Sequence, residues 1–177
     1  MFVKRNALKG LKMQDIDDFR LCLGKFATGV TIVSCADDKG RPYGVTANSF
    51  SSVSLAPPLI LWNIAKVTQS LTAYLEASHF AVNILAAEQR DLSNHFAKSR
   101  HDLFEGIEFG LNSRGVPILP GTLACLECRT DAIHDCGDHY IIVGEVESFS
   151  ERDVQPLLFY GGRYAAVESG WHENLTN

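Results

Sequence analysis

Apolar residues recur at helical spacing near the start of the chain, before the sequence changes to short β-rich runs. The apolar positions, three or four residues apart, are Ile16, Phe19, Leu23 and Phe26. This spacing predicts a first helix from about Asp15, which can cap it, to Ala27, and Gly29 ends it.

Short β-rich runs fill much of the remaining chain. Residues 30–35 and 42–47 flank a turn signal, Asp37-Asp38-Lys39-Gly40, and predict a β-hairpin. Further strands are predicted at 59–64, 80–85, 122–134, 140–150, 156–160 and 162–167. Helices are predicted at 68–77, capped near Thr68, and at 87–97, and the Gly- and Pro-containing stretch 98–120 predicts a long irregular segment.

Many short strands with helices at intervals indicate a mainly β protein with α elements. The pattern favours a closed β-barrel decorated by helices. At 177 residues, with glycine and proline spread along the chain and no evident linker, residues 1–177 are expected to form a single domain.

The composition narrows the class of protein. It is 46% hydrophobic and 21% charged, as in ordinary globular proteins. No apolar run approaches the roughly 20 residues that a membrane helix needs, and the basic N-terminus lacks an apolar signal core. We therefore expect no membrane association and a cytoplasmic location.

The charge and the cysteine content argue against two further classes of protein, nucleic-acid-binding proteins and disulfide-rich proteins. The net charge of −5 argues against a nucleic-acid surface, because such surfaces depend on clustered Lys and Arg. The five cysteines form an odd set without a secreted context, so reduced thiols are expected rather than a disulfide framework.

The segment 44–54 is the most distinctive part of the chain, because it places hydroxyl, amide and glycine groups between two apolar strands and ends near Pro57-Pro58. Such groups match the alternating donors and acceptors on the rim of a flavin ring, and hydroxyls can hold a phosphate without a buried cation. A Ser- and Thr-rich strand and turn without a ligand is the alternative.

Several motifs recur in order along the chain: 26–33, 44–54, Pro57-Pro58, 80–85, Gly137-Asp138-His139 and 156–160. Together they resemble the short-chain flavin reductases, which supply reduced flavin to two-component aromatic monooxygenases. The similarity runs from about Phe19 to Val167 and is nearest to the reductase components of chlorophenol 4-monooxygenase systems. One departure is Ala56, where many relatives carry Asp.

The resemblance implies an FMN-binding split β-barrel, a homodimer, and a flavin-dependent monooxygenase that receives the reduced flavin. It favours FAD as flavin, with FMN as the alternative. The absence of a clear arginine cluster for a 2′-phosphate favours NADH over NADPH as hydride donor, and a 2′-phosphate contact by Arg100, Arg114 or Arg163 would reverse this preference. Because no Gly-x-Gly-x-x-Gly or Walker-type loop occurs, NADH is expected in a fold-specific groove against the flavin. The flavin-binding set predicted around the distinctive segment is Thr28, Thr46, Ala47, Asn48, Ser49, Ser51, Ser52 and Asn63.

His139 is the predicted catalytic residue. It follows Gly137-Asp138 at the start of an apolar strand, and the matching pair in the family lies on the nicotinamide side of the flavin. The resemblance implies that His139 hydrogen-bonds the nicotinamide carboxamide or stabilises the reduced ring. The alternative is a histidine satisfied by a backbone carbonyl at a strand end.

Three further groups are candidates for ligand contacts. Lys66 and Ser70 flank a predicted helix start and are candidates for a phosphate, with a plain helix cap as the alternative. Phe96 and Arg100, near the junction of the predicted helix 87–97 and the irregular segment, are candidates for the dinucleotide tail, with an exposed charged helix end as the alternative. Tyr160 and Arg163 flank a glycine pair and are candidates for the flavin edge or NADH, although a tight hairpin also needs those glycines.

A metal site is not expected, although Cys125-Leu126-Glu127-Cys128 has the spacing of a zinc half-site and Cys136 lies downstream. Residues three apart in a strand project to opposite faces. Core packing is therefore the preferred interpretation of Cys125 and Cys128.

Three functions stay open on these grounds. The first is an NADH-dependent flavin reductase, the second a flavin-binding carrier or redox sensor of the same fold without turnover, and the third a flavin enzyme that reduces a small organic substrate directly. NADH oxidation that depends on added flavin separates the first from the second.

Overall fold

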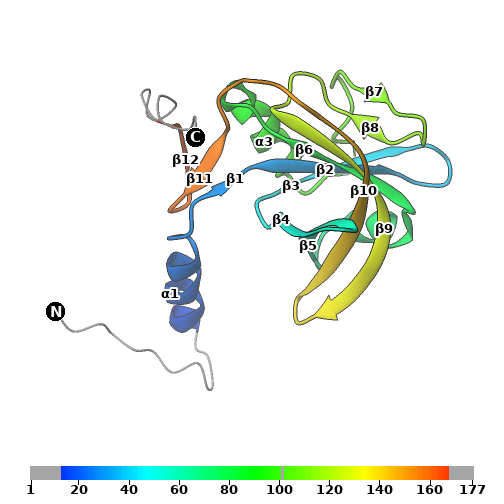
Figure 1. The fold of residues 1–177 in the computed structure, drawn as a ribbon. Coiled ribbons are helices and arrows are strands. Elements are labelled where there is room, and N and C mark those ends of the chain that lie inside the picture. The colour runs from blue at the N-terminus through cyan, green and yellow to red at the C-terminus, as the bar shows by residue number, and fades with distance from the viewer. Residues whose placement is uncertain (1–12, 101, 168–177) are drawn as a thin grey trace.

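The computed structural model describes residues 13–100 and 102–167 of the chain. Its main element is a seven-stranded sheet that curls on itself, with the strand order β3-β2-β6-β9-β10-β5-β4 (Figure 1). The bounds are β2 Thr31–Ala36, β3 Pro42–Ala47, β4 Ser51–Leu55, β5 Pro58–Ala65, β6 His79–Ile84, β9 Ala124–Cys136 and β10 His139–Glu151. All neighbouring pairs in this sheet are antiparallel.

The barrel is split rather than closed. Among the described residues no ladder joins β3, at one end of the strand order, to β4 or β5 at the other. The expectation of a closed barrel is therefore wrong at this seam, and the mainly β split barrel that the resemblance implied is confirmed. The loop at 48–50 runs from β3 to β4 across the open seam.

A smaller sheet joins the two ends of the described chain. Its strand order is β1-β11-β12, with β1 Thr28–Gly29, β11 Leu158–Tyr160 and β12 Arg163–Ala165. Helix α1, Met13–Leu23, precedes β1 and lies beside this sheet at the rim of the molecule (Figure 1). The predicted helix extended to Ala27, but the backbone turns after Leu23 so that β1 can pair with β11.

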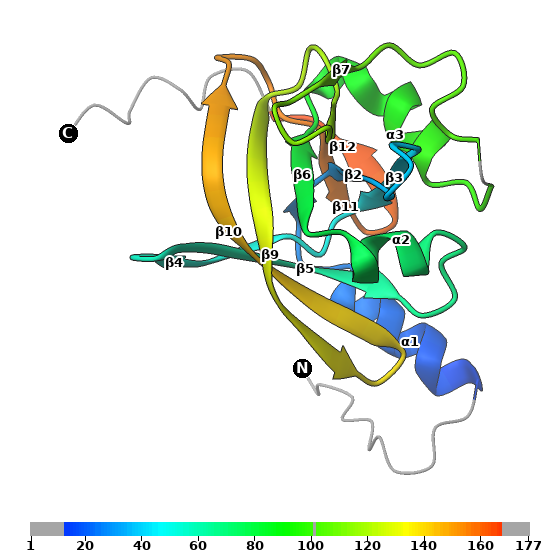
Figure 2. The same ribbon diagram turned by 90° about the vertical axis from the view of Figure 1, so that its right-hand side faces the viewer.

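The remaining elements are short. They are α2 Leu71–Glu76, the 3-10 turn η1 Ala87–Gln89, α3 Arg90–Phe96, and the two-residue strands β7 Gly110–Leu111 and β8 Pro117–Ile118. Helix α2 begins three residues after the predicted start at Thr68, and Ser70 at its N-cap makes no side-chain cap bond. In the predicted irregular stretch, residues 98–100 and 102–120 are irregular apart from the β7–β8 pair (Figure 2).

Strand β2 is the centre of the core, which explains its nearly continuous apolar sequence. Val33 belongs to the buried cluster with Trp62 and Phe80, whereas Ile32 faces a second cluster that includes Phe96. A strand buried on both faces needs apolar residues at successive positions. The alternation of the two clusters along β2 follows the two-residue period of a strand.

Gly44 of β3 makes room for one of these contacts. A Cβ atom at position 44 would lie 2.4 Å from a ring atom of Phe96, so only glycine allows the α3 ring to rest on the strand. Thr46 adds a hydrogen bond from its hydroxyl to the Ser93 carbonyl, 2.7 Å away. These contacts fix α3 beside the strand that leads into the 48–50 loop.

Candidate functional site

The 48–50 loop is held against β5 by a pair of hydrogen bonds from one side chain. Ser49 Oγ accepts the backbone N–H of Asn63 at 2.9 Å and donates to the Asn63 carbonyl at 3.1 Å. One hydroxyl therefore satisfies both backbone groups of Asn63 at the split seam. The sequence predicted a ligand-binding role for Ser49, and the structure shows that it also fastens the loop.

A large cavity of about 770 Å³ opens beside this loop. Its walls come from the loop, from β5, from the end of α1 with the turn that follows, and from the β11–β12 hairpin. The residues that line it are Arg20, Leu23, Gly24, Phe26, Thr28, Asn48, Ser49, Phe50, Ser51, Asn63, Phe159 and Gly162. This volume falls within the range of small-molecule sites, roughly 300–1,000 Å³.

Two smaller cavities adjoin the large one. The first, of about 210 Å³, is called the His139 cavity, and it lies between β3 and β5 with Thr68 and His139 at its border. The second, of about 190 Å³, is called the Tyr164 cavity, and it includes Ser93 and Tyr164. Asn48 lines all three cavities, so they lie next to one another around the loop.

Three buried polar atoms in the walls of this site lack hydrogen-bond partners. They are the hydroxyl oxygen of Thr28, the side-chain carbonyl oxygen of Asn63 and the indole nitrogen of Trp62. Thr28 lines the large cavity, Trp62 lines the His139 cavity, and Asn63 lines both. Buried polar groups are normally paired, so this set of one donor, one acceptor and one hydroxyl fits a ligand with mixed donors and acceptors on a flat rim.

His139 begins β10 at the edge of its cavity, and its ring is oriented by the preceding residue. Nδ1 lies 2.7 Å from Asp138 Oδ1. The hydrogen bond from His139 holds the pKa of the Asp138 carboxyl below its ordinary value. An ionised carboxylate can only accept, so Nδ1 carries the donated hydrogen and Nε2 is the nitrogen left for a ligand.

The lowered pKa of Asp138 makes the contribution of this contact to stability depend on pH in one direction. A carboxyl with a lowered native pKa stabilises the fold above the ordinary aspartate pKa, and this contribution is lost as the pH falls through the lowered value. The orientation of the His139 ring is thus maintained at neutral pH.

Comparison with known proteins places this site in a family. Residues 23–168 match the model of the flavin reductase like domain. The chain belongs to the flavin reductase-like family. It is 49% identical over 146 residues to the FMN reductase (NADH) SmoA of Agrobacterium fabrum, covering 82% of this chain and 83% of that protein.

Two other members of the flavin reductase-like family are also similar over most of their length. The reductase subunit HsaB of a flavin-dependent monooxygenase from Rhodococcus jostii is 43% identical, with 89% of this chain and 84% of that protein covered. The solved NADH:FAD oxidoreductase SgcE6 of Streptomyces globisporus, in complex with NAD and FAD fragments, has a TM-score of 0.84 at 34% identity, covering 91% of this chain and 98% of that one.

Most of the residues that the sequence predicted to bind flavin lie around the site. The predicted residues that line the three cavities are Thr28, Thr46, Ala47, Asn48, Ser49, Ser51, Asn63 and His139. Ser52 is exposed on β4 and is not among the lining residues. Ser51 and Ser52 belong to a strand rather than to a loop, which turns neighbouring side chains to opposite faces.

The prediction for Phe96 is wrong. Its side chain is 1% exposed and packs against Phe104, with ring centroids 5.0 Å apart. The helix that carries it turns this face onto Gly44 instead of toward a ligand. Phe96 is a core residue of the flavin reductase-like fold.

Other predicted residues lie outside the cavity walls. Lys66 binds Asp135, with 2.6 Å between Nζ and Oδ1, and Arg100 is exposed beyond the end of α3. Tyr160 and Arg163 are exposed on either side of the β11–β12 turn, whose Gly162 does line the large cavity. Their ligand contacts stay predictions.

Sequence patterns missed Trp62, Arg20 and Phe159 as site residues. Trp62 is fully buried, and only its unpaired indole N–H distinguishes it from an ordinary core residue. Arg20 and Phe159 reach the large cavity because β1 pairs with β11. No local motif signals a contact between segments so far apart in the chain.

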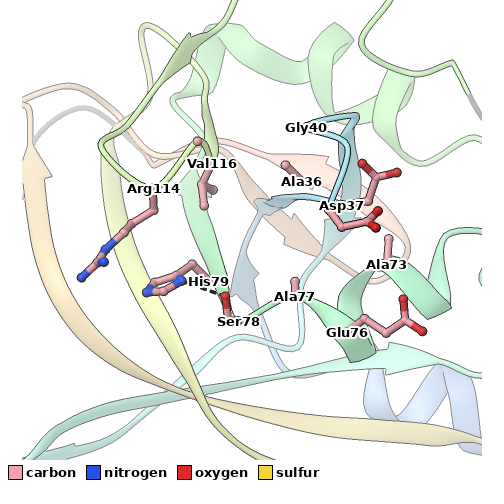
Figure 3. A pocket seen from close by; sticks show the side chains of 12 residues that line it. Ala36, Asp37, Gly40, Ala73, Glu76, Ala77, Ser78, His79, Arg114 and Val116 are labelled. Carbon is pink, nitrogen blue, oxygen red and sulfur yellow. Dashed lines mark hydrogen bonds between the residues drawn. The ribbon is translucent and has the colours of Figure 1, made fainter.

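Another cavity, of about 430 Å³, lies away from the flavin-binding set (Figure 3). Its borders include the β2–β3 turn, the end of α2 and the β7–β8 turn. Asp37 there accepts the backbone N–H groups of Lys39 and Arg41, and His79 contacts Ser78 (Figure 3) and lies 3.7 Å from Glu147. Nε2 of His79 is also a buried atom without a hydrogen-bond partner. Because none of the predicted flavin-binding residues lines this cavity, we assign the reaction to the site around Asn48.

The structure places Cys125 and Cys128 in two different packing clusters. Cys125 packs with Ala81 and Val116, whereas Cys128 belongs to the separate cluster of Trp62. Burial raises the pKa of both thiols to about 12, which disfavours the thiolate that a metal requires. Within residues 13–100 and 102–167 no group of three or more His, Cys, Asp or Glu side chains is placed to hold a metal.

Replacing both Cys125 and Cys128 with alanine is expected to preserve flavin binding and to lower the free energy of unfolding by about 1–2 kcal/mol, because small cavities replace two buried sulfur atoms. Flavin titration and chemical denaturation measure the two effects. The exposed Cys22 is the control, since Cys22→Ala removes a thiol without disturbing the core. Loss of flavin binding together with release of zinc would contradict the core assignment.

In the part of the chain that the structure describes, no helix is long and apolar enough to cross a membrane. Trp171 and His172, which the sequence suggests as stacking or docking residues, lie outside that part.

Proposed function

We propose that this chain is an NADH-dependent flavin reductase that releases reduced flavin to a flavin-dependent monooxygenase. The observation that carries the proposal is the group of adjoining cavities around Asn48, with unpaired polar atoms in their walls and His139 at one border. Relatives named as an NADH-dependent FMN reductase and as a monooxygenase reductase subunit support the same activity.

The residues present suit a flavin and a nicotinamide side by side. The large cavity offers Thr28, Ser51 and Arg20 around an apolar floor that includes Phe159, and the His139 cavity adjoins it through Asn63. When bound, the flavin supplies the acceptor for the hydride that NADH gives up. The protein contributes binding and orientation, because hydride transfer depends on close alignment of the two rings.

His139 is assigned to the nicotinamide side. Its Nε2 is the nitrogen left by the Asp138 bond and can accept from the carboxamide N–H₂. The neighbouring Thr68 borders the same cavity and adds a hydroxyl. Together they hold the nicotinamide without transferring a proton to it.

The placement of the arginines supports NADH over NADPH, and both flavins are left as substrates to be tested. Arg114 lies 3.8 Å from Glu147 at the outlying cavity, and Arg100 and Arg163 are exposed, so no arginine cluster forms beside His139 among the described residues. The relatives include one named for FMN and one for FAD.

The test is NADH and NADPH oxidation by the purified protein with FAD, with FMN and without flavin, followed at the nicotinamide absorbance band. NADH oxidation that requires added flavin is expected, with reduced flavin accumulating under anaerobic conditions. Tight flavin binding without NADH oxidation would contradict the proposal and identify a carrier or sensor.

We further propose that the chain forms a homodimer and works in the cytoplasm, where NADH and the oxygenase meet it. Strand β4 is at the end of the main sheet and exposes Leu55 at 95% and Val53 at 49%, and Phe149 of β10 is 72% exposed. A free strand edge with apolar side chains favours pairing with a second copy. Analytical ultracentrifugation is expected to give the dimer mass, and a monomer mass would contradict this proposal.

A further inference from the structure

The end of the β9–β10 hairpin projects from the barrel and has few neighbours (Figure 1). Strand β6 pairs with β9 only as far as Arg129, and Thr130 makes the next contacts, to Ser78 and Ala77. Beyond Thr130, strand β9 has β10 on one side and no strand on the other among the described residues. Strand β10 is paired on its other side with β5 as far as His139 and Ala65, so the outer arm of β9 and the turn are the parts of the hairpin that depend on additional contacts.

Lys66 supplies additional contacts at the hairpin end. Its Nζ lies 2.6 Å from Asp135 Oδ1 and 5.0 Å from the centroid of the Tyr140 ring. Its backbone N–H donates to the Asp138 carbonyl at 2.9 Å. The loop after β5 is therefore attached to both arms of the hairpin turn.

The same attachment reaches the proposed catalytic residue. His139 is the register partner of Ala65, the residue before Lys66, and this is the last pair between β10 and β5. Ala65, Thr68 and His139 all line the His139 cavity, whereas Lys66 does not. The lysine side chain points to Asp135 rather than into the cavity.

We propose that the Lys66–Asp135 ion pair is a positioning device that holds His139 at the border of its cavity, so that Lys66 is a positioning residue instead of a phosphate ligand. This inference rests on the proposed function and adds a residue to it. If the ion pair is broken, the hairpin end moves more freely and Nε2 of His139 spends less time in register with the nicotinamide.

The charge state of the pair supports this role. The hydrogen bond to Asp135 raises the pKa of the Lys66 ammonium, so the cation persists across the working pH range. Lys66 is 33% and Asp135 62% exposed at the side chain, and exposed ion pairs contribute little to global stability. Breaking the pair is therefore expected to alter kinetics without unfolding the protein.

The experiment compares Lys66→Met, Lys66→Arg, Asp135→Asn and the double variant of Lys66→Met with Asp135→Asn. The first and third are each expected to lower kcat/KM for NADH by about fivefold to tenfold, the double variant no further, and Lys66→Arg is expected to retain near-normal activity. FMN affinity is expected to stay unchanged in all four. Asp131→Asn is the control, because it removes an equal charge from an exposed site on the same strand.

The Asp135→Asn variant distinguishes a positioning role of Lys66 from a phosphate-binding role. If the lysine binds phosphate, Lys66→Met weakens FMN binding while Asp135→Asn strengthens it by releasing the ammonium, and the positioning proposal is overturned. Kinetics equal to those of Asp131→Asn would also overturn it.

Hydrogen exchange at residues 135–140 tests the proposal independently of turnover. Faster exchange is expected in Lys66→Met and Asp135→Asn than in Asp131→Asn, and equal exchange would refute the attachment. If wild-type protein oxidises no NADH, the proposed function fails, whereas the exchange result still decides whether the ion pair holds the hairpin.

Discussion

Ser49→Leu is expected to weaken flavin binding by about two orders of magnitude. The substitution removes the hydroxyl that bonds both the N–H and the carbonyl of Asn63. Leaving a buried amide group unpaired costs roughly 1–3 kcal/mol, equivalent to about fivefold to 150-fold in the equilibrium that keeps the loop in its binding position. The added side chain also fills space shared by the large cavity and the His139 cavity.

Titration of flavin fluorescence or absorbance gives the affinity directly. The matched control is Ser113→Leu, in the exposed turn between β7 and β8, which makes the same chemical change far from the site. If the two variants bind flavin equally well, the 48–50 loop is not part of the flavin site.

His139→Ala is expected to lower kcat/KM for NADH by about tenfold to a hundredfold while flavin affinity stays close to that of the wild type. The reason is that the ring lines the His139 cavity but not the large cavity, and the His139 cavity is the side that we propose for the nicotinamide. Steady-state kinetics with saturating flavin measure the loss. An accompanying thermal denaturation curve shows whether the fold is preserved.

His134→Ala controls for the removal of an imidazole from the same hairpin, since His134 is exposed on β9 and pairs in register with Ile141. A lower melting temperature with unchanged kinetics in His139→Ala would mean that the ring only stabilises the start of strand β10. His139→Gln adds a further check, because an amide can replace the hydrogen bond to the carboxamide.

The strands and hairpins could be predicted because their signals are local. The turn 37–40 and the apolar runs around it contain all the information needed for the β2–β3 hairpin, and the structure confirms that pairing. The segment 44–54 was likewise recognisable from its density of hydroxyls. Its Ser49 and Asn48 line the site.

The errors concern contacts between distant segments. The sequence predicted a ligand contact for Phe96, but its ring packs on Gly44, which lies 52 residues earlier in the chain. Arg20 joins the large cavity because β1 and β11 pair across most of the sequence. The phosphate contact of Lys66 stays a prediction, but no sequence pattern indicated the carboxylate that engages this lysine, which lies 69 residues away. Contacts between residues so far apart in the chain produce no periodic pattern in the sequence.

The pairing of β1 with β11 also sets an order of events during synthesis. The large cavity takes Leu23 and Phe26 from near the start of the chain, but it needs Phe159 and Gly162 from near its end. All seven strands of the main sheet have left the ribosome before those residues appear. The nascent protein can thus bury its barrel core first and acquires a place for flavin only as the last segment emerges.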